Sequence, residues 1–237
     1  MAPTLTNVTS NRSVLAALTH ARNRYRKMPI WFRRRIDGAL GTGIYKRPMI
    51  QRGALFIHVP KSAGTSIAQS LFGLPAVGHY TALEARAYDA DLFRKLFSFA
   101  FVRHPISRSL SAYHYLRSGG TEDVPVAFPQ RYAHIQKLSF PEFVEWLQSI
   151  DVNASSPVLH TQTKYVCDGQ HSILVDFIGR FESIQQDFAT ISNRLNLTVQ
   201  LAEYNVSTTS QTEALDSGVD RRLRSIYQAD FENFAYT

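Results

Sequence analysis

Short apolar runs alternate with longer stretches of helical periodicity along most of the chain. Uninterrupted apolar runs of this kind are typical of strands that are buried on both faces of a parallel sheet. They cover residues 54–59, 98–102 and 173–178. Apolar residues recur every three or four positions in the stretches that follow them, which is typical of helices. These stretches begin near residues 65, 106 and 183. The alternation predicts an α/β fold, with a mostly parallel sheet flanked by helices.

Two further helices are predicted from their first turns. Thr81 is followed three residues later by Glu84, and Ser139 is followed at the same distance by Glu142. A hydroxyl residue and a glutamate at this spacing form a capping box, in which each side chain bonds the backbone of the other residue. We therefore expect one helix over residues 82–88 and another over residues 140–150.

The loop between the first apolar run and its helix has the composition of an anion site. It consists of small or hydroxylic residues around one lysine: Lys61, Ser62, Ala63, Gly64, Thr65 and Ser66. In a strand–loop–helix unit, the loop amides and the helix N-terminus direct N–H donors at one position. Gly64 allows the backbone to approach an anion closely, and Lys61 adds a mobile positive charge.

The layout of this loop differs from that of the enzymes that bind nucleoside triphosphates. Their phosphate loop, G-x-x-x-x-G-K-[ST], places the lysine directly after the second glycine. Here Lys61 precedes Gly64 by three residues, and His58 stands six residues before Gly64. The loop is therefore suited to an anion such as phosphate, but it does not have the sequence of a kinase or ATPase.

A second anion site is predicted after the second apolar run. Arg103 follows that run directly, at the end of the strand where ligands bind in open α/β sheets. Ser111 lies eight residues further on, about two helical turns away, and can project toward the same place. A guanidinium group and a hydroxyl are suited to a second phosphate, which arginine binds through two parallel hydrogen bonds.

Together the two segments, HVPKSAGTSI and FAFVRHPISRSLSAY, resemble the donor motifs of the sulfotransferase superfamily, in its carbohydrate-type branch. Weaker similarity continues to about residue 236. The resemblance implies a P-loop-like sulfotransferase fold and 3′-phosphoadenosine-5′-phosphosulfate (PAPS) as the co-substrate, with no metal. It also implies that residues 61–66 bind the 5′-phosphosulfate and that Arg103 and Ser111 bind the 3′-phosphate.

The resemblance also implies candidates for proton transfer and for acceptor binding. His79 follows a glycine at the place where some carbohydrate sulfotransferases carry their catalytic base. A histidine is suited to this role because its pKa lies near neutrality. His160 and Gln162 resemble a family element in which these residues bracket a proline, but Thr161 stands in the proline's place. His160 is the second candidate for the base or for acceptor contact, and Gln162 is a candidate acceptor contact.

The implied reaction is an in-line transfer of a sulfuryl group to an acceptor hydroxyl, with Lys61 and the loop amides stabilising the leaving phosphate. The implied acceptor is a carbohydrate: a polysaccharide, an oligosaccharide or a glycolipid. A small molecule or a lipid is an alternative acceptor. Two other classes also remain open: a small kinase on a P-loop scaffold, and a non-catalytic protein that binds a nucleotide or a glycan.

Charge is distributed unevenly along the 237 residues. Residues 1–52 contain eleven of the 26 Lys and Arg residues but only one of the 19 acidic ones. The remainder is mildly acidic, which argues against a nucleic-acid-binding protein. We therefore expect a basic N-terminal extension over residues 1–52 and a single catalytic domain over residues 53–237.

The basic extension has three interpretations. It can pack its aromatic residues on the domain, which we favour; it can bind a membrane surface or an anionic glycan; or it can be an organelle transit peptide. It lacks the apolar segment of a secretory signal, and no run in the chain approaches the ~18 apolar residues of a membrane span. The single cysteine, Cys167, cannot form an internal disulfide. We expect a cytoplasmic protein, with peripheral membrane contact through the extension as an alternative.

Overall fold

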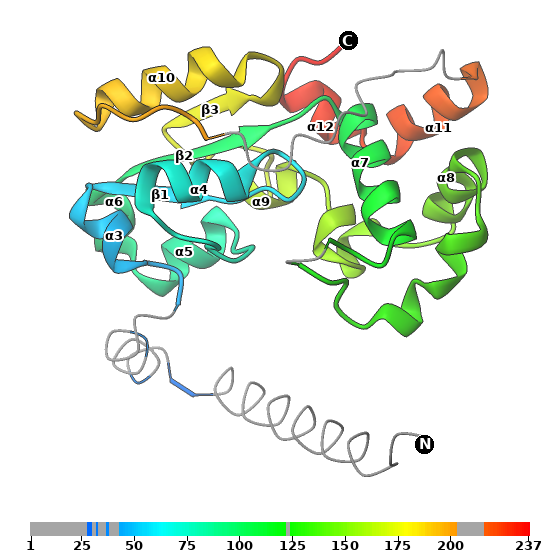
Figure 1. The fold of residues 1–237 in the computed structure, drawn as a ribbon, viewed down its shortest axis with the longest axis horizontal. Coiled ribbons are helices and arrows are strands. Elements are labelled where there is room, and N and C mark those ends of the chain that lie inside the picture. Colours follow the sequence, from blue (N-terminus) through cyan, green and yellow to red (C-terminus); the bar gives the residue numbers. More distant parts are fainter. Residues whose placement is uncertain (1–27, 30–31, 33–36, 38–42, 122–123, 203–215) are drawn as a thin grey trace, which may run out of the picture. The chain divides into compact units, whose positions relative to one another are not determined.

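The computed structural model describes residues 28, 29, 32, 37, 43–121, 124–202 and 216–237. The chain divides into two compact units, Met1–Gly43 and Ile44–Thr237. Most of the basic extension, with its expected contacts to a membrane, a glycan or the domain, lies outside the described residues. The second unit contains all the strands shown in Figure 1. No helix in the described part of the chain combines the length and the apolar composition that crossing a membrane requires.

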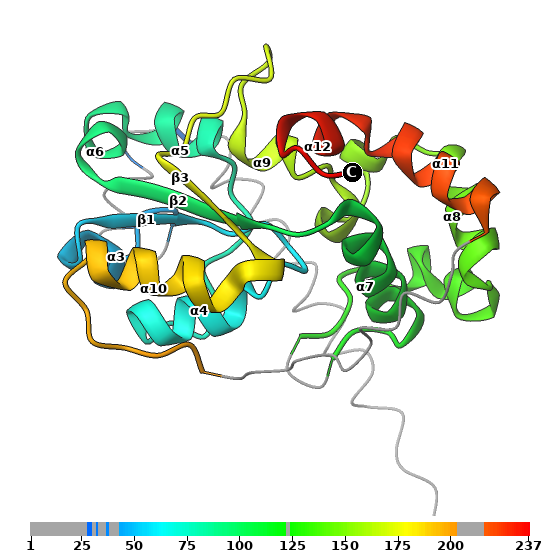
Figure 2. The same cartoon turned by 90° about the horizontal axis from the view of Figure 1, so that it is seen from above.

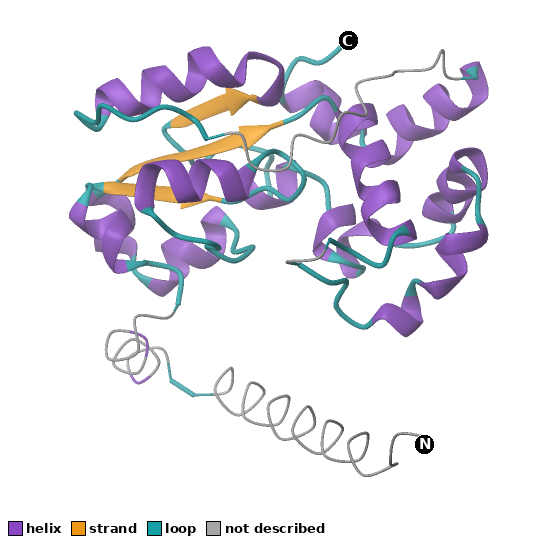
Figure 3. Ribbon diagram, viewed as in Figure 1, coloured by secondary structure: helices purple, strands orange, loops and turns teal. Residues whose placement is uncertain are grey.

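A three-stranded parallel sheet lies in one part of the second unit (Figure 3). Its strands lie in the order β1 (Ala54–Ile57), β2 (Phe97–Val102) and β3 (Phe177–Arg180). All four residues of β1 are buried, as are five of the six in β2. Burial on both faces explains why the first two runs are continuously apolar. The predicted α/β fold with a parallel sheet is confirmed.

The third strand begins later than the apolar run predicts. Residues 173–178 were expected in the sheet, but β3 starts at Phe177. The N–H and hydroxyl groups of Ser98 both donate to the Asp176 carboxylate, at 2.8 Å each. The Asp176 side chain therefore takes the Ser98 N–H, which a longer β3 would bond through a backbone carbonyl. Ile173 forms an isolated antiparallel bridge with Cys167 instead. The sheet therefore uses only the end of the run and the two residues that follow it.

Helices cover both faces of the sheet (Figure 2). On one face lie α4 (Gly64–Phe72) and α10 (Ile184–Arg194), and on the other α5 (Ala82–Tyr88) and α6 (Ala90–Lys95). The short helix α3 (Arg47–Gln51) contacts β1. The predicted capping box of α5 is present: the Glu84 N–H donates to the Thr81 hydroxyl at 3.0 Å, and the Thr81 N–H donates to the Glu84 carboxylate at 2.8 Å.

A second group of helices lies beyond the carboxyl ends of the strands (Figure 1). It comprises α7 (Pro105–Arg117), α8 (Phe140–Gln148), α11 (Ser217–Ile226) and α12 (Gln228–Asn233). The expected glutamate cap of α8 is formed, since the Ser139 N–H donates to the Glu142 carboxylate at 2.7 Å. In the described residues, the connections contain α9 (Thr163–Val166) and the 3₁₀ turns η1 (Pro129–Arg131), η2 (Ala133–Lys137), η3 (Val152–Ala154), η4 (Pro157–Leu159) and η5 (Phe181–Ser183).

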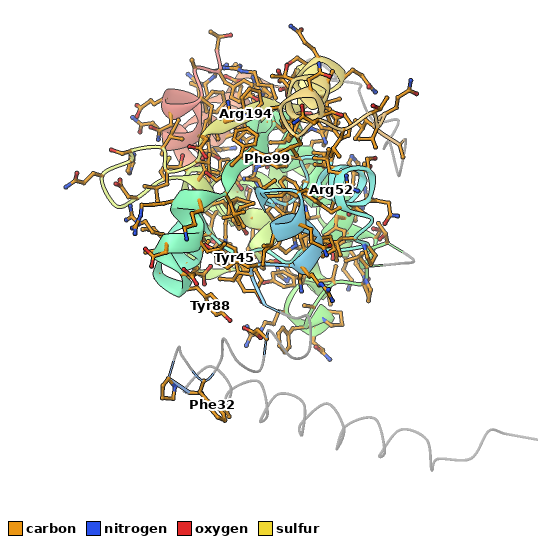
Figure 4. All side chains as sticks on the ribbon, turned by 90° about the vertical axis from the view of Figure 1, so that its left-hand side faces the viewer. Phe32, Tyr45, Arg52, Tyr88, Phe99 and Arg194 are labelled. Atoms are coloured by element: carbon orange, nitrogen blue, oxygen red, sulfur yellow. The ribbon has the colours of Figure 1, made fainter. Side chains whose placement is uncertain are left out.

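The buried apolar residues form two clusters. The sheet cluster draws on residues 44–102, 165–191 and 234, and the helix cluster on residues 106–159 and 219–231. Phe99 lies in the middle of the sheet cluster (Figure 4), where its ring stacks on that of Phe56 with centroids 5.1 Å apart. Arg194 covers the ring of Phe97, with its guanidinium carbon 4.2 Å from the ring centroid. The predicted anion-binding residues Lys61 and Arg103 follow the carboxyl ends of β1 and β2.

Candidate active site

The loop that leaves β1 is shaped by two residues in the left-handed backbone conformation. Lys61 has a φ of 68° and Ala63 a φ of 61°. Consecutive turns of this kind orient successive N–H groups toward one side and form an anion-binding concavity. Helix α4 begins at Gly64, and Ala63 at its N-cap provides no side-chain acceptor. The first N–H groups of a helix have no intrahelical acceptor, so this end of α4 is open to an anion.

An unpartnered hydroxyl adds an independent sign of a ligand at this loop. Ser62 is 1% exposed, and within the described residues its hydroxyl oxygen has no hydrogen-bond partner. A buried polar group without a partner is energetically unfavourable, and native structures seldom leave one unless a ligand or water satisfies it. The predicted anion loop, residues 61–66, therefore contains a buried hydroxyl group, that of Ser62, which a bound ligand could satisfy.

Gly64 is required because its neighbour leaves no room for a side chain. A Cβ atom at this position would lie 1.9 Å from Cδ2 of His58 and 2.0 Å from Nε2. The His58 ring is half-buried and also packs on Phe56, with centroids 5.8 Å apart. The loop can therefore close over His58 only when residue 64 is glycine.

We expect Gly64→Ala to lower the free energy of unfolding by about 1–3 kcal/mol, the usual cost of overpacking. The added methyl group displaces the His58 ring, so the double variant Gly64→Ala/His58→Ala should recover part of the loss. Denaturant unfolding measures both effects. Gly169→Ala is the matched control, because a Cβ at Gly169 meets nothing within 4 Å. Equal stability of the single and double variants would contradict this account of the clash.

Lys61 is a half-buried cation without a carboxylate partner among the described residues. Its ammonium nitrogen lies 4.7 Å from the centroid of the Tyr115 ring on α7. Burial, and secondarily the charge of Arg103, lowers the pKa of Lys61 to about 8. An anion between these two cations would remove part of the penalty that burial and mutual repulsion impose on them.

Arg103 lies directly after β2, with its guanidinium group held by three contacts. Nε donates to the Ser107 hydroxyl at 2.9 Å, and one terminal nitrogen donates to the Lys61 carbonyl at 3.4 Å. The group also stacks over Phe181, 4.1 Å from the ring centroid. Burial lowers the pKa of Arg103, opposed by the nearby Glu182 carboxylate, but an arginine remains charged. Its remaining N–H groups suit an oxyanion.

Ser111 lies on the face of α7 that is directed toward the loop. Ser107, Ser111 and Tyr115 are spaced by four residues, so they form one row along the helix. The first member of the row contacts Arg103 and the last contacts Lys61. Ser111 is half-buried between them. The structure therefore brings together Lys61, Arg103 and Ser111, as the motifs predict.

His79 is exposed, and its ring stands against that of His58, with centroids 4.5 Å apart. Its Nδ1 lies 3.5 Å from the His58 carbonyl oxygen. A carbonyl only accepts, so Nδ1 carries the proton and Nε2 is left with its lone pair. Partial burial of the ring lowers the pKa of His79, and the hydrogen bond to His58 opposes that shift. Neutral His79 thus has the tautomer of a proton acceptor.

His160 is half-buried, and one of its ring nitrogens donates a hydrogen bond. Nε2 donates to the Ser155 carbonyl at 3.1 Å, which leaves Nδ1 with its lone pair. Nδ1 lies 3.3 Å from the Tyr165 hydroxyl, which itself donates to the Pro157 carbonyl at 2.9 Å. Burial lowers the pKa of His160 to about 4, with smaller contributions from nearby charges that include His79. The two histidines therefore lie within electrostatic range of each other, and they differ in access, since His79 is exposed and His160 is half-buried.

Gln162 is fully buried and contacts Arg103. Its side-chain oxygen accepts from the Arg103 N–H at 2.8 Å, and its side-chain nitrogen donates to the Arg103 carbonyl at 2.8 Å. The structure thus places Gln162 beneath the second anion site. Its predicted contact with an acceptor stays a prediction.

Arg108 and Asp230 are buried charges that sequence reasoning missed. Arg108 is completely buried and donates to the carbonyls of Val158 at 3.1 Å and His160 at 2.7 Å. Its guanidinium group lies 3.9 Å from the Asp230 carboxylate. The periodicity of α7 could have indicated that Arg108 is buried. Arg108 lies four residues before Ala112, in the row of apolar residues that faces the helix cluster. An arginine in an apolar row indicates a buried partner.

Among the described residues, no group of three or more His, Cys, Asp or Glu side chains is arranged to hold a metal ion. Residues 51–237 match the profile of the sulfotransferase family. The comparison with curated proteins and the comparison with solved structures each found no match. The family match covers both anion-binding segments, His79 and His160, and it confirms the resemblance inferred from the motifs.

Proposed function

The chain belongs to the sulfotransferase family and is a sulfuryl-transferring enzyme, and from this premise we propose that it transfers a sulfuryl group from PAPS to a hydroxyl group of a carbohydrate. One observation carries the choice of donor. Two cations, the half-buried Lys61 and the buried Arg103, follow adjacent parallel strands, and neither forms an ion pair with a carboxylate in the described part of the chain. PAPS offers one anionic group to each cation.

The residues present fit this donor. The open end of α4, the unsatisfied Ser62 hydroxyl and the Lys61 ammonium group are suited to the 5′-phosphosulfate. The Arg103 guanidinium and the Ser111 hydroxyl are suited to the 3′-phosphate. The donor supplies the sulfuryl group, whose bond to the phosphate oxygen breaks as a bond to the acceptor oxygen forms. Lys61 and the loop amides stabilise the charge left on the departing phosphate.

His79 is proposed as the general base. Its Nε2 takes the proton of the acceptor hydroxyl, and the hydrogen bond from Nδ1 to the His58 carbonyl stabilises the resulting imidazolium. The same hydrogen bond holds the ring in the required orientation. Because His79 is exposed, it can release the proton to water after each turnover. His160 is the weaker candidate, since its ring is half-buried, its Nδ1 lies against the Tyr165 hydroxyl, and burial lowers its pKa to about 4.

A carbohydrate acceptor is supported by the carbohydrate-type motifs and by the position of the base. The proposed base lies on a surface-exposed segment, where Gly78, His79 and Tyr80 are all exposed. A hydroxyl group of a long or branched glycan can reach such a base without the whole acceptor entering the protein. We propose this class of acceptor over a small molecule or a lipid.

Calorimetric titration with 3′-phosphoadenosine-5′-phosphate (PAP), the desulfated donor, tests the proposed donor. We expect PAP to bind at least about 100-fold more tightly than ATP with magnesium, because only PAP carries the 3′-phosphate that Arg103 recognises. AMP serves as a second control that lacks this phosphate. Preferential binding of ATP with magnesium would overturn the proposed donor and favour a phosphoryl-transferring enzyme.

A further inference from the structure

The backbone of Arg103 lies at the junction between a strand and a helix. Strand β2 ends at Val102, and helix α7 begins at Pro105. The N–H and carbonyl groups of Arg103 therefore fall outside both regular patterns of backbone hydrogen bonds. Buried backbone groups of this kind need other partners. The Gln162 side chain provides both: it accepts from the N–H at 2.8 Å and donates to the carbonyl at 2.8 Å.

Gln162 is itself held by a buried acid. Its backbone N–H donates to the Asp230 carboxylate at 2.9 Å. The same carboxylate accepts from the Thr163 N–H and hydroxyl, at 2.8 Å each. Asp230 and Gln162 are both completely buried. The three hydrogen bonds to Asp230 therefore fix the backbone of residues 162 and 163, from which the Gln162 side chain extends to Arg103.

With its backbone fixed, the Arg103 side chain has few directions left. The bond from Nε to Ser107 and the stacking on Phe181 define the plane of the guanidinium group. A rotation of the Arg103 peptide would move that plane and separate its N–H groups from a bound anion. The energy of a two-point bond to phosphate depends on this orientation.

We infer that Gln162 is a positioning residue for recognition of the donor's 3′-phosphate, acting through the backbone of Arg103. The inference rests on the proposed function and deepens it, since it assigns Gln162 to the donor. The complete burial of the Gln162 side chain leaves it out of contact with an acceptor in solution. Gln162 then affects how well the protein distinguishes a donor with a 3′-phosphate from a nucleotide without one, and it does not touch the reacting atoms.

The test compares the affinities for PAP and for AMP, which differ by the 3′-phosphate alone. Gln162→Met keeps the length of the side chain but removes both hydrogen bonds to Arg103. We expect the PAP-to-AMP affinity ratio to fall about 10-fold or more, with AMP affinity nearly unchanged. Gln162→Asn, which is one methylene shorter, should lower the ratio in the same direction and provides a second route if the methionine variant does not fold.

Ser192→Ala is the matched control. It removes a buried hydrogen bond from α10 to the Leu197 carbonyl and belongs neither to the Asp230 contacts nor to the surroundings of Arg103. We expect a lower melting temperature with the wild-type PAP-to-AMP ratio. An unchanged ratio in the Gln162 variants, or an equal fall in Ser192→Ala, would overturn the inference. A wild-type protein that does not distinguish PAP from AMP would instead overturn the proposed donor.

Discussion

Replacing His79 with alanine is expected to lower kcat ~100-fold or more while leaving the affinity for PAP unchanged. His79 is exposed, and its Nδ1 lies 3.5 Å from the His58 carbonyl, so Nε2 keeps a lone pair directed away from that bond. In the proposed mechanism His79 takes the proton of the acceptor hydroxyl, so its removal should slow the chemical step. Steady-state rates at saturating donor, together with calorimetric titration of PAP, separate the loss of chemistry from a loss of binding.

His160→Ala is the comparison that decides between the two histidines. Because the His160 ring nitrogens face Ser155 and Tyr165, we expect its removal to lower stability more than kcat. The pH profile gives a further criterion. The pKa of His79 is lowered, so the wild-type rate should fall only below about pH 6.5, where His79 becomes protonated. A ~100-fold loss in His160→Ala, with little loss in His79→Ala, would exchange the two roles.

Lys61→Met is expected to lower kcat/KM for the donor about 100- to 1000-fold, the usual scale for losing one group that stabilises a developing negative charge. Methionine preserves most of the apolar stem that packs near Tyr115 but removes the ammonium group. Initial rates at low donor concentration measure the effect. Lys95→Met, at an exposed position on α6, is the control for a general loss of positive charge.

The charge of Lys61 also predicts how donor use depends on pH. The pKa of Lys61 is lowered to about 8, so the ammonium form predominates below that pH and is lost above it. We therefore expect kcat/KM for the donor to decline as pH rises through about 8, and to be flat there in Lys61→Met. A decline of the same size in both proteins would assign the titration to another group.

The sequence predicted the parts of the fold that depend on local pattern. The runs that form β1 and β2 are continuously apolar because both faces of those strands are buried, and the capping box of α5 lies within four residues. The start of β3 was missed because it depends on a contact between Ser98 and Asp176, which are 78 residues apart. No pattern within residues 173–178 shows that the Asp176 side chain bonds the Ser98 N–H.

The same distinction applies to the site. Lys61, Arg103 and Ser111 were predicted because each lies within a short motif at the end of a strand. The environments of Gln162 and Arg108 depend on partners 50 to 68 residues away, so sequence spacing could not predict them. The proposed ranking of the two histidines uses their exposure and the contacts of their ring nitrogens, which sequence spacing does not show.

The two apolar clusters have a consequence for how a substrate reaches the site. Along the described residues, buried apolar side chains change from one cluster to the other four times: between residues 102 and 106, 159 and 165, 191 and 219, and 231 and 234. A hinge motion between two parts of a protein meets least resistance where the chain passes between them only once or twice. Four crossings, together with the buried contacts of Arg108 at the junction, oppose a swinging motion of one cluster against the other. We therefore expect acceptors to enter by local rearrangement of surface loops, with the two clusters moving as one body.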